Sequence, residues 1–521
     1  MQDTTDFEFS RSNKRCPVDA LPPELLLDIF LNNTRLVDNW DDDRLTTARY
    51  TSQVCQKWRS LILAYPSIWG QILNIHQIAQ ATAEWGEELR SRVGDAMLWI
   101  TGEISHISPR SFLATFLKEK WANVQIFDIV IYQLEALIEI WPILQSKAPN
   151  LESFVIHAHC SPTLPVLRPI FDDVAPRLRH FQAKSMHSMI PFSPAAPWLS
   201  NLCSISFSWI HTVYFIFSVL KSAPLLETVE IIGSKHFSQR VVTTEEDANA
   251  ISINLTRLKH LRISQRHFTE VFSLLKHIKA LPSCGLVVTW ILGLEAGASH
   301  DIEETNTVLV KWVSAFVDSY QPKSVILELQ QDVFKHPLGS SNAHFLSVSV
   351  GVPENPHQIP SFVAEIYIDH PSGYSALRAL ATCPGLSSVQ RLSFVRMPPA
   401  VGEELVPLFP AFSGVTELVL DRCRHDTIQA FQLYDSLRSQ RQVPIFPLLQ
   451  TVQIQGWDNF SMSVDYVLDF LEYRARIGSP VLLLDLGEGF NDGFTEDQKS
   501  RLRQIDGLVV SKPQNVASGA R

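Results

Sequence analysis

The sequence predicts an α/β protein in which a small N-terminal helical segment precedes a long series of helix, turn and strand units. Two patterns predict this organisation: three separated apolar motifs lie within residues 17–73, and an apolar pattern with strand periodicity recurs beyond residue 120. Composition agrees, because 45% hydrophobic and 19% charged residues in a chain of 521 supply apolar surface for more than one core.

Charge and cysteine usage argue against several classes of function. With 44 basic and 54 acidic residues the net charge is −10, and no basic stripe occurs, so we expect no nucleic-acid or membrane partner. The seven cysteines are scattered without a C-x-x-C pair, and the first 15 residues lack the apolar core of a secretory signal. We therefore expect reduced thiols and an intracellular protein, in the cytoplasm or nucleus.

The first ordered element is expected in "VDALPPELLLDIFLNN", after a flexible tail over residues 1–16. Pro22 and Pro23 suit the first turn of a helix, and Leu21, Leu25 and Ile29 recur every fourth residue. The acidic run 41–43 that follows fits either the positive end of the next helix or a solvated loop.

A second apolar helix face is expected around residues 54–65. Val54, Trp58 and Ile62 recur at helical spacing, Pro66 ends the helix, and Trp69 belongs to a short closing segment.

The repeating pattern is an apolar anchor followed by apolar residues three and five positions later. Prolines often precede the anchor, and an amphipathic helix precedes the proline, so each unit is a helix, a turn and a short strand. One unit cannot cover its own apolar face, so we expect stacked units with parallel strands and outer helices in a solenoid, although a compact α/β sheet has the same alternation. The anchors are Val124, Leu151, Leu178, Leu202, Leu226, Leu258, Val363, Val389, Val415, Leu449 and Val481.

The pattern is interrupted between Leu258 and Val363. Strand-like pieces remain at 285–292, 324–330 and 344–352, and we expect irregular or mobile loops around 295–306 and 335–343. Residues 198–220 contain no Asp, Glu, Lys or Arg, but polar side chains interrupt the run and Ile205, Phe207 and Trp209 alternate, which favours a strand over a membrane helix.

The repeat region resembles a degenerate leucine-rich-repeat domain over residues 96–510. The asparagine or cysteine expected eight residues after the anchor occurs only as Cys423, so we expect no regular asparagine ladder. A helical linker over 74–95 and a flexible tail over 511–521 complete the predicted organisation.

The N-terminal motifs "LPPELLLDIF", "VCQKWRSL" and "PSIW" resemble an F-box over residues 17–73. The order and content of the three motifs are most similar to fungal F-box proteins, in which a leucine-rich-repeat-like domain often follows. The segment between Phe30 and Val54 is longer than in many F-boxes, and Gln56 and Ile68 replace the commoner basic and leucine residues. The insertion could change the affinity for an adaptor.

The resemblance implies a subunit of a ubiquitin ligase without chemistry of its own. An F-box docks on a Skp-type adaptor, which joins it to a cullin scaffold, while the rest of the chain captures a protein target, unknown here. In the alternative, the helices cap the solenoid in a scaffold protein outside any ligase, and Trp69 ties them to it. The adaptor contacts implied are Leu21, Pro22, Glu24, Leu25, Ile29, Phe30, Val54, Cys55, Trp58 and Trp69.

Signals of catalysis, metal or cofactor binding are weak. His157, His159 and Cys160 lie close in sequence, but no second ligand cluster accompanies them. The glycines of 487–493 are wrongly spaced for a dinucleotide loop, and acidic residues lie among them. We expect no enzyme, cofactor or metal site; an α/β enzyme is the weakest hypothesis. Trp209, Trp290 and Trp457 could anchor a target, although core positions are favoured for them.

Overall fold

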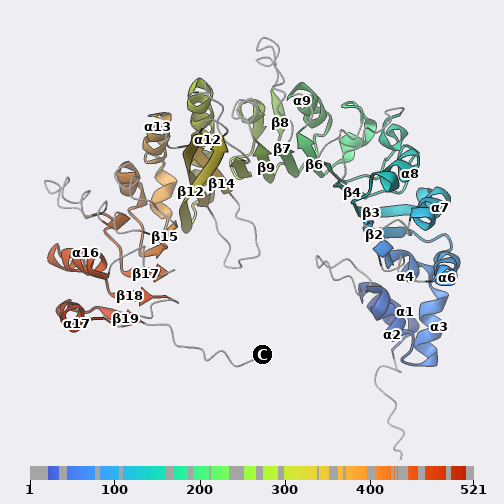
Figure 1. The fold of residues 1–521 in the computed structure, drawn as a ribbon, viewed down its shortest axis with the longest axis horizontal. Helices are drawn as coiled ribbons and strands as arrows, with labels where there is room; N and C mark the ends of the chain where they lie inside the picture. Colours follow the sequence, from blue (N-terminus) through green and yellow to red (C-terminus); the bar gives the residue numbers. More distant parts are fainter. Residues whose placement is uncertain are drawn as a thin grey trace, which may run out of the picture. The chain divides into compact units, whose positions relative to one another are not determined.

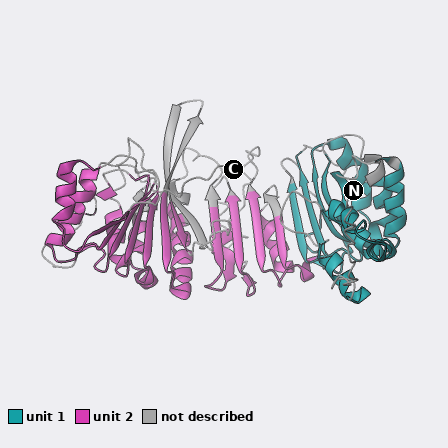
Figure 2. Ribbon diagram, turned by 90° about the horizontal axis from the view of Figure 1, so that it is seen from below, with its two compact units in different colours: residues 1–198 teal, residues 199–521 magenta. Residues whose placement is uncertain are grey.

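The structure, a computed structural model, divides the chain into two compact units, residues 1–198 and 199–521 (Figure 2). The division lies within the predicted repeat domain. The residues described are 21–33, 44–76, 82–104, 110–159, 168–185, 192–209, 213–233, 252–265, 274–290, 299–336, 339–350, 362–367, 371–395, 405–423, 427–428, 431, 444–455, 464–487 and 494–511. Residues 1–16 and 512–521 of the predicted tails, the acidic run 41–43, Cys160, Trp457 and the glycines beyond Gly487 lie outside these residues, whereas Ser511, the first residue of the predicted C-terminal tail, ends a strand.

Unit 1 begins with a cluster of short helices. They are α1 (Pro23–Asn33), α2 (Arg44–Thr51), α3 (Gln56–Ala64) and α4 (Pro66–Gln71), followed by α6 (Ala83–Val93). Leu26, Phe30 and Ile62 form the buried centre of the cluster.

The start of the second predicted helix differs in the structure. Val54 lies in the turn between α2 and α3, because Cys55 is extended (φ −157°, ψ 167°) and α3 begins only at Gln56. Pro66 does more than end α3: it occupies the first turn of α4, where its missing N–H costs no hydrogen bond.

The sheet of unit 1 is parallel throughout its described pairs. Its strands are β1 (Leu73–Asn74), β2 (Leu98–Ile104), β3 (Val124–Ile131), β4 (Ser153–Ala158) and β5 (His180–Ser185), paired in chain order. Helices α7 (Arg110–Lys120) and α8 (Leu134–Leu144) lie on one side of β2 to β4 (Figure 1). Short 3₁₀ helices η2 (Trp121–Asn123), η3 (Ile170–Asp173) and η4 (Pro197–Asn201) precede strands.

The predicted anchors define the core of both units. Every anchor whose side chain is described is at most 2% exposed. The residues three positions later stand in register on adjacent strands: Phe127 pairs with Phe154, and Phe154 with Phe181. Their rings stack, with centroids 5.5 and 5.7 Å apart. The proline-anchor pattern therefore located the core-facing strand positions.

Unit 2 also alternates strands and helices. In chain order it contains β6 (Ser204–Trp209), α9 (Val213–Ser222), β7 (Thr228–Gly233), β8 (Ile253–Leu255), β9 (His260–Gln265), β10 (Ile278–Ala280), β11 (Gly285–Trp290), α12 (Ser299–Tyr320), β12 (Ser324–His336), β13 (Gly339–Val350), β14 (Phe362–Tyr367), α13 (Pro371–Leu380), η5 (Pro384–Ser388), β15 (Arg391–Val395), η7 (Val406–Phe412), β16 (Glu417–Asp421), β17 (Thr451–Gln455), α16 (Val464–Arg476), β18 (Leu483–Leu486), α17 (Glu496–Arg503) and β19 (Val509–Ser511).

Two parallel runs of strands are joined by an antiparallel one. Strands β6, β7, β9, β11 and β14 pair in parallel, as do β12, β15, β16, β17, β18 and β19. Strand β13 is antiparallel to both β14 and β12, and β8 and β10 form a separate parallel pair.

The expectation of irregular loops between Leu258 and Val363 is wrong in two places. Residues from Ser299 onward form the 22-residue helix α12, whose Leu309, Val313 and Val317 recur every fourth residue and are buried. Residues 335–336 and 339–343 belong to the antiparallel pair β12 and β13. The polar start of α12 concealed the helical period, and the alternation of a strand does not reveal the direction of its partner.

The uncharged segment 198–220 contains β6 and part of α9, so the predicted strand is confirmed. Among the described residues, no helix has both the length and the apolar character needed to cross a membrane.

Candidate functional site

Among the described residues of α1 to α4, the exposed large apolar side chains are Leu63 of α3 and four that lie on α1 and around the turn between α2 and α3. Leu25 and Ile29 of α1 are 50% and 45% exposed, and Val54 and Tyr50, around the turn between α2 and α3, are 62% and 68% exposed. We call these four residues the helical patch. Leu25 and Ile29 lie one turn apart on the side of α1 away from buried Leu26 and Phe30, which explains why this row remains outside the core.

Contacts between the helices hold the patch in place. Lys57 Nζ donates to the carbonyl of Leu21 at 3.0 Å, which joins the first turn of α3 to the start of α1. The rings of Phe30 and Trp58 meet edge to face, with centroids 5.1 Å apart, so Trp58 packs on the inner side of α1.

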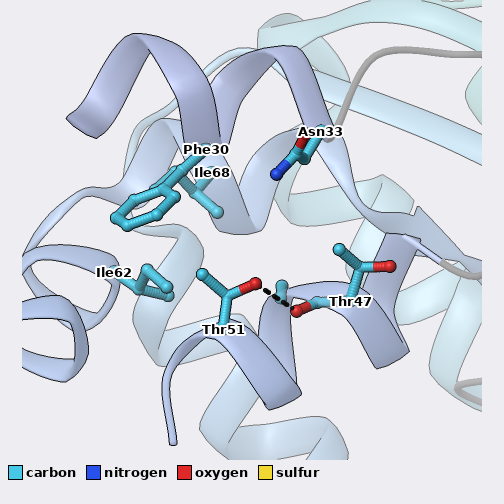
Figure 3. Close-up of a pocket in the computed structure, with 7 residues that line it drawn as sticks. Phe30, Asn33, Thr47, Thr51, Ile62 and Ile68 are labelled. Atoms are coloured by element: carbon cyan, nitrogen blue, oxygen red, sulfur yellow. Dashed lines mark hydrogen bonds between the residues drawn. The ribbon is translucent and has the colours of Figure 1, made fainter. Parts of the chain in front are cut away.

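A small, mostly apolar pocket opens between α1, α2 and the junction of α3 with α4 (Figure 3). Thr51 Oγ1 donates to the carbonyl of Thr47 at 2.7 Å at its edge, which satisfies that hydroxyl. The pocket has space for a small apolar group rather than a cofactor. Its lining residues are Phe30, Asn33, Thr47, Ala48, Thr51, Ile62 and Ile68.

Trp69 connects the helical cluster with α6. Its side chain is 1% exposed, and its Nε1 donates to the carbonyl of Ile62 at 2.8 Å. The ring meets Trp85 edge to face at 6.2 Å, and the Arg92 guanidinium lies 4.7 Å from its centroid. Trp69 is therefore an internal tie of unit 1.

Arg44 connects the same cluster with the sheet. This arginine is only 7% exposed; it donates to the carbonyl of Gln71 and to Thr101 Oγ1, both at 2.8 Å. Next to this contact, a Cβ on Gly70 would lie 2.5 Å from the carbonyl oxygen of Met97, so α4 approaches the start of β2 as closely as only glycine permits.

The residues assigned to the adaptor from the sequence fall into three groups. Pro22, Glu24, Leu25, Ile29 and Val54 are exposed; Leu21, Cys55 and Trp58 are half-buried; Phe30 and Trp69 are buried, at 3% and 1%. Phe30 and Trp69 thus offer almost no surface and support the patch from inside. Tyr50 was missed, because α2 is polar and gives no periodic apolar signal.

The two histidines considered as metal ligands contact neighbouring side chains, and the thiol of Cys284 is buried. His157 Nε2 lies 2.6 Å from an amide nitrogen of Gln182, and the His159 ring stacks on Tyr132 at 4.8 Å. Burial raises the pKa of the Cys284 thiol to about 12, so it stays protonated at neutral pH. In the part of the chain that the structure describes, no group of three His, Cys, Asp or Glu side chains could hold a metal ion.

No protein-family model matches the chain, and no curated protein is significantly similar to it. The function must therefore be inferred from the motifs, the burial of their residues and the contacts between the helices. Those observations concentrate on the helical patch.

Proposed function

We propose that the chain is the target-binding subunit of a ubiquitin ligase of the Skp, cullin and F-box type. The helical patch docks on the Skp-type adaptor, which links the chain to a cullin, and the rest of the chain binds a protein target. One observation carries this proposal: Leu25, Ile29 and Val54, which the F-box motifs assign to the adaptor, are large apolar side chains left exposed on a packed helical cluster.

We further propose that residues 96–510 form a leucine-rich-repeat-like solenoid. Buried anchors, in-register parallel strands and helices between the strands support it. Cys423 lies eight residues after its anchor, and its thiol donates to the carbonyl of Phe394 in the preceding repeat at 3.2 Å. This hydrogen bond gives the carbonyl of Phe394 a partner in the next repeat. The resemblance to a leucine-rich repeat implies this role for the asparagine or cysteine at this position.

The alternative function, a cap without a ligase, also has support. Arg44 and Trp69 bind the helices to β2 and α6, so the cluster covers the start of the sheet in unit 1. These contacts use the inner sides of the helices and leave the helical patch outside. The same N-terminal helices can therefore cap the sheet of unit 1 and dock on an adaptor. A measurement of adaptor binding distinguishes the two functions.

Changing Leu25 and Ile29 together to glutamate is expected to weaken adaptor binding by about 100-fold or more. Two apolar side chains that become buried in a complex each contribute roughly 1.5–3 kcal/mol, and buried unpaired carboxylates add a further penalty. Co-purification of the full-length variant with the adaptor measures the loss. Its melting temperature should remain close to wild type, because both side chains are exposed.

The matched control is Ile138→Glu on α8, where the isoleucine is 48% exposed. This variant introduces one of the same exposed apolar-to-glutamate changes outside the patch and should keep wild-type adaptor binding. Equal loss in both variants, or undiminished binding by the double variant, would count against docking through the helical patch.

A further inference from the structure

The sheet of unit 1 has a second face, opposite the buried anchors. On β3, Asp128 lies on this face four residues after the anchor Val124, with Ile126 and Val130 on the same face along the strand. In register with Asp128 are Thr101 on β2 and Val155 on β4. The Asp128 carboxylate is thus surrounded by three apolar side chains and one hydroxyl.

The surroundings of this carboxylate are unusual for an acid. Within the described residues, Asp128 has no hydrogen bond or ion pair, and burial raises its pKa. The hydroxyl of neighbouring Thr101 accepts from Arg44, whose guanidinium also binds the carbonyl of Gln71. On β4, His157 contacts Gln182 on β5.

In unit 2, acidic residues four positions after an anchor have polar partners. Glu230 and Asp485 also stand four residues after an anchor, and each has a partner at the equivalent position of an adjacent strand. Glu230 accepts from Ser206 Oγ at 2.7 Å and lies 3.7 Å from an Arg262 nitrogen, and Asp485 accepts from Gln453 Nε2 at 3.1 Å. On the preceding strand Asp128 has Thr101, whose hydroxyl is engaged by Arg44, where Glu230 has Ser206 and Asp485 has Gln453; on the following strand it has apolar Val155 where Glu230 has Arg262.

We propose that this face of unit 1 binds a protein segment that places one lysine or arginine against Asp128 and apolar side chains on the half-buried Ile126 and Val155. The charge identifies the occupant, because a cation would pair the carboxylate and the apolar surroundings would exclude water from the pair. A flat face four strands wide, about 15 Å across, suits an extended segment of a protein better than a small ion. The inference rests on the proposed function, since it makes this face the target-binding surface.

The test selects peptides from a random 12-residue display library on the immobilised full-length protein. Enriched peptides are synthesised, and their affinities are measured for wild type, for Asp128→Asn and for Glu139→Gln. Glu139 is an exposed acid on α8, so its variant removes the same charge away from the face. We expect enriched peptides with a lysine or arginine between apolar residues, bound at least 10-fold more weakly by Asp128→Asn and unchanged by Glu139→Gln.

Three results would overturn the inference. They are enrichment only of peptides without a basic residue, equal binding of basic peptides by wild type and Asp128→Asn, and no enrichment above an empty support. Full displacement of the peptides by millimolar spermine, with spermine binding lost in Asp128→Asn, would assign the face to a small polyamine and also overturn the protein segment.

Stability gives a second readout on the same variant. Burial penalises the charged carboxylate, so the native state loses stability as pH rises from the unfolded pKa, about 3.9, through the raised native pKa. The charged and titratable groups near Asp128 are Glu103 on β2, 3.7 Å from His76 Nδ1, His157 on β4, and Arg44 of α2, which donates to the neighbouring Thr101 hydroxyl at 2.8 Å. Asp128→Asn should therefore raise the melting temperature at pH 7, with no gain below about pH 3.5. An Asp128→Asn variant less stable than wild type at pH 7 would contradict an unpaired acid.

Adaptor binding separates this inference from the proposed function. Asp128→Asn should retain the adaptor, and the Leu25→Glu, Ile29→Glu variant should retain the basic peptides. Absence of peptide binding by a wild-type chain that binds the adaptor rejects the target surface alone, whereas failure of wild type to bind the adaptor rejects the ligase.

Discussion

Replacing Trp69 with alanine is expected to destabilise the helical cluster by about 3–5 kcal/mol, the usual cost of truncating a buried tryptophan. The change removes a side chain that is 1% exposed, its hydrogen bond to the carbonyl of Ile62, and its contacts with Trp85 and Arg92. Amide hydrogen exchange should show faster opening of α3, α4 and α6, and adaptor binding should weaken with it.

Trp69→Phe is the matched control for this variant. It keeps a ring in the cavity but loses the indole hydrogen bond, so we expect a smaller cost, about 1–2 kcal/mol. The measurement also decides the role of Trp69. If Trp69→Ala lost adaptor binding with unchanged exchange rates in these helices, Trp69 would be a direct adaptor contact, contrary to its burial.

Replacing Phe154 with alanine should cost about 3–5 kcal/mol in the sheet of unit 1. Phe154 is fully buried and lies between two stacked rings, Phe127 and Phe181, with Phe171 edge to face at 5.0 Å. The cavity would break the continuous row of rings that joins β3, β4 and β5. Chemical denaturation with hydrogen exchange of these strands measures the loss.

Phe154→Leu provides the comparison. It keeps most of the buried volume and loses the ring contacts, so its cost should be roughly 1–2 kcal/mol. A cost below 1 kcal/mol for Phe154→Ala would show that the stacked residues do not form the core, and that the repeat pattern misplaces it.

The sequence predicted the core positions well because they depend on a local pattern. The residues three and five positions after the anchor face the same side of a strand whatever the strand pairs with, and the anchor enters the core just before or at the start of that strand. Val124, Phe127 and Ile129 could therefore be placed before any tertiary contact was known. The direction of pairing depends on distant partners, which explains why the antiparallel strand β13 was missed. Helix α12 was missed for a different reason: its first turns are polar, and they hid the helical spacing of the apolar residues that follow.

The candidate site was predictable as a segment but not side chain by side chain. Helix α1 carries apolar residues nearly all round, including Leu25, Leu26, Ile29 and Phe30, so its periodicity could not show which row turns inward. Packing against α2 and α3 decides it and buries Leu26 and Phe30. Asp128 drew no attention in the sequence, because its isolation depends on which residues stand in register on β2 and β4.

The most direct test of the proposed function is the affinity of the purified full-length chain for a purified Skp-type adaptor, measured by titration calorimetry. We expect a 1:1 complex with a Kd below about 1 µM, which corresponds to roughly −8 kcal/mol. Binding should fall by about 100-fold or more in the Leu25→Glu, Ile29→Glu variant and persist in Ile138→Glu. A folded wild-type chain that shows no binding at adaptor concentrations of about 10 µM would contradict the account and leave the helical cluster as a cap of unit 1.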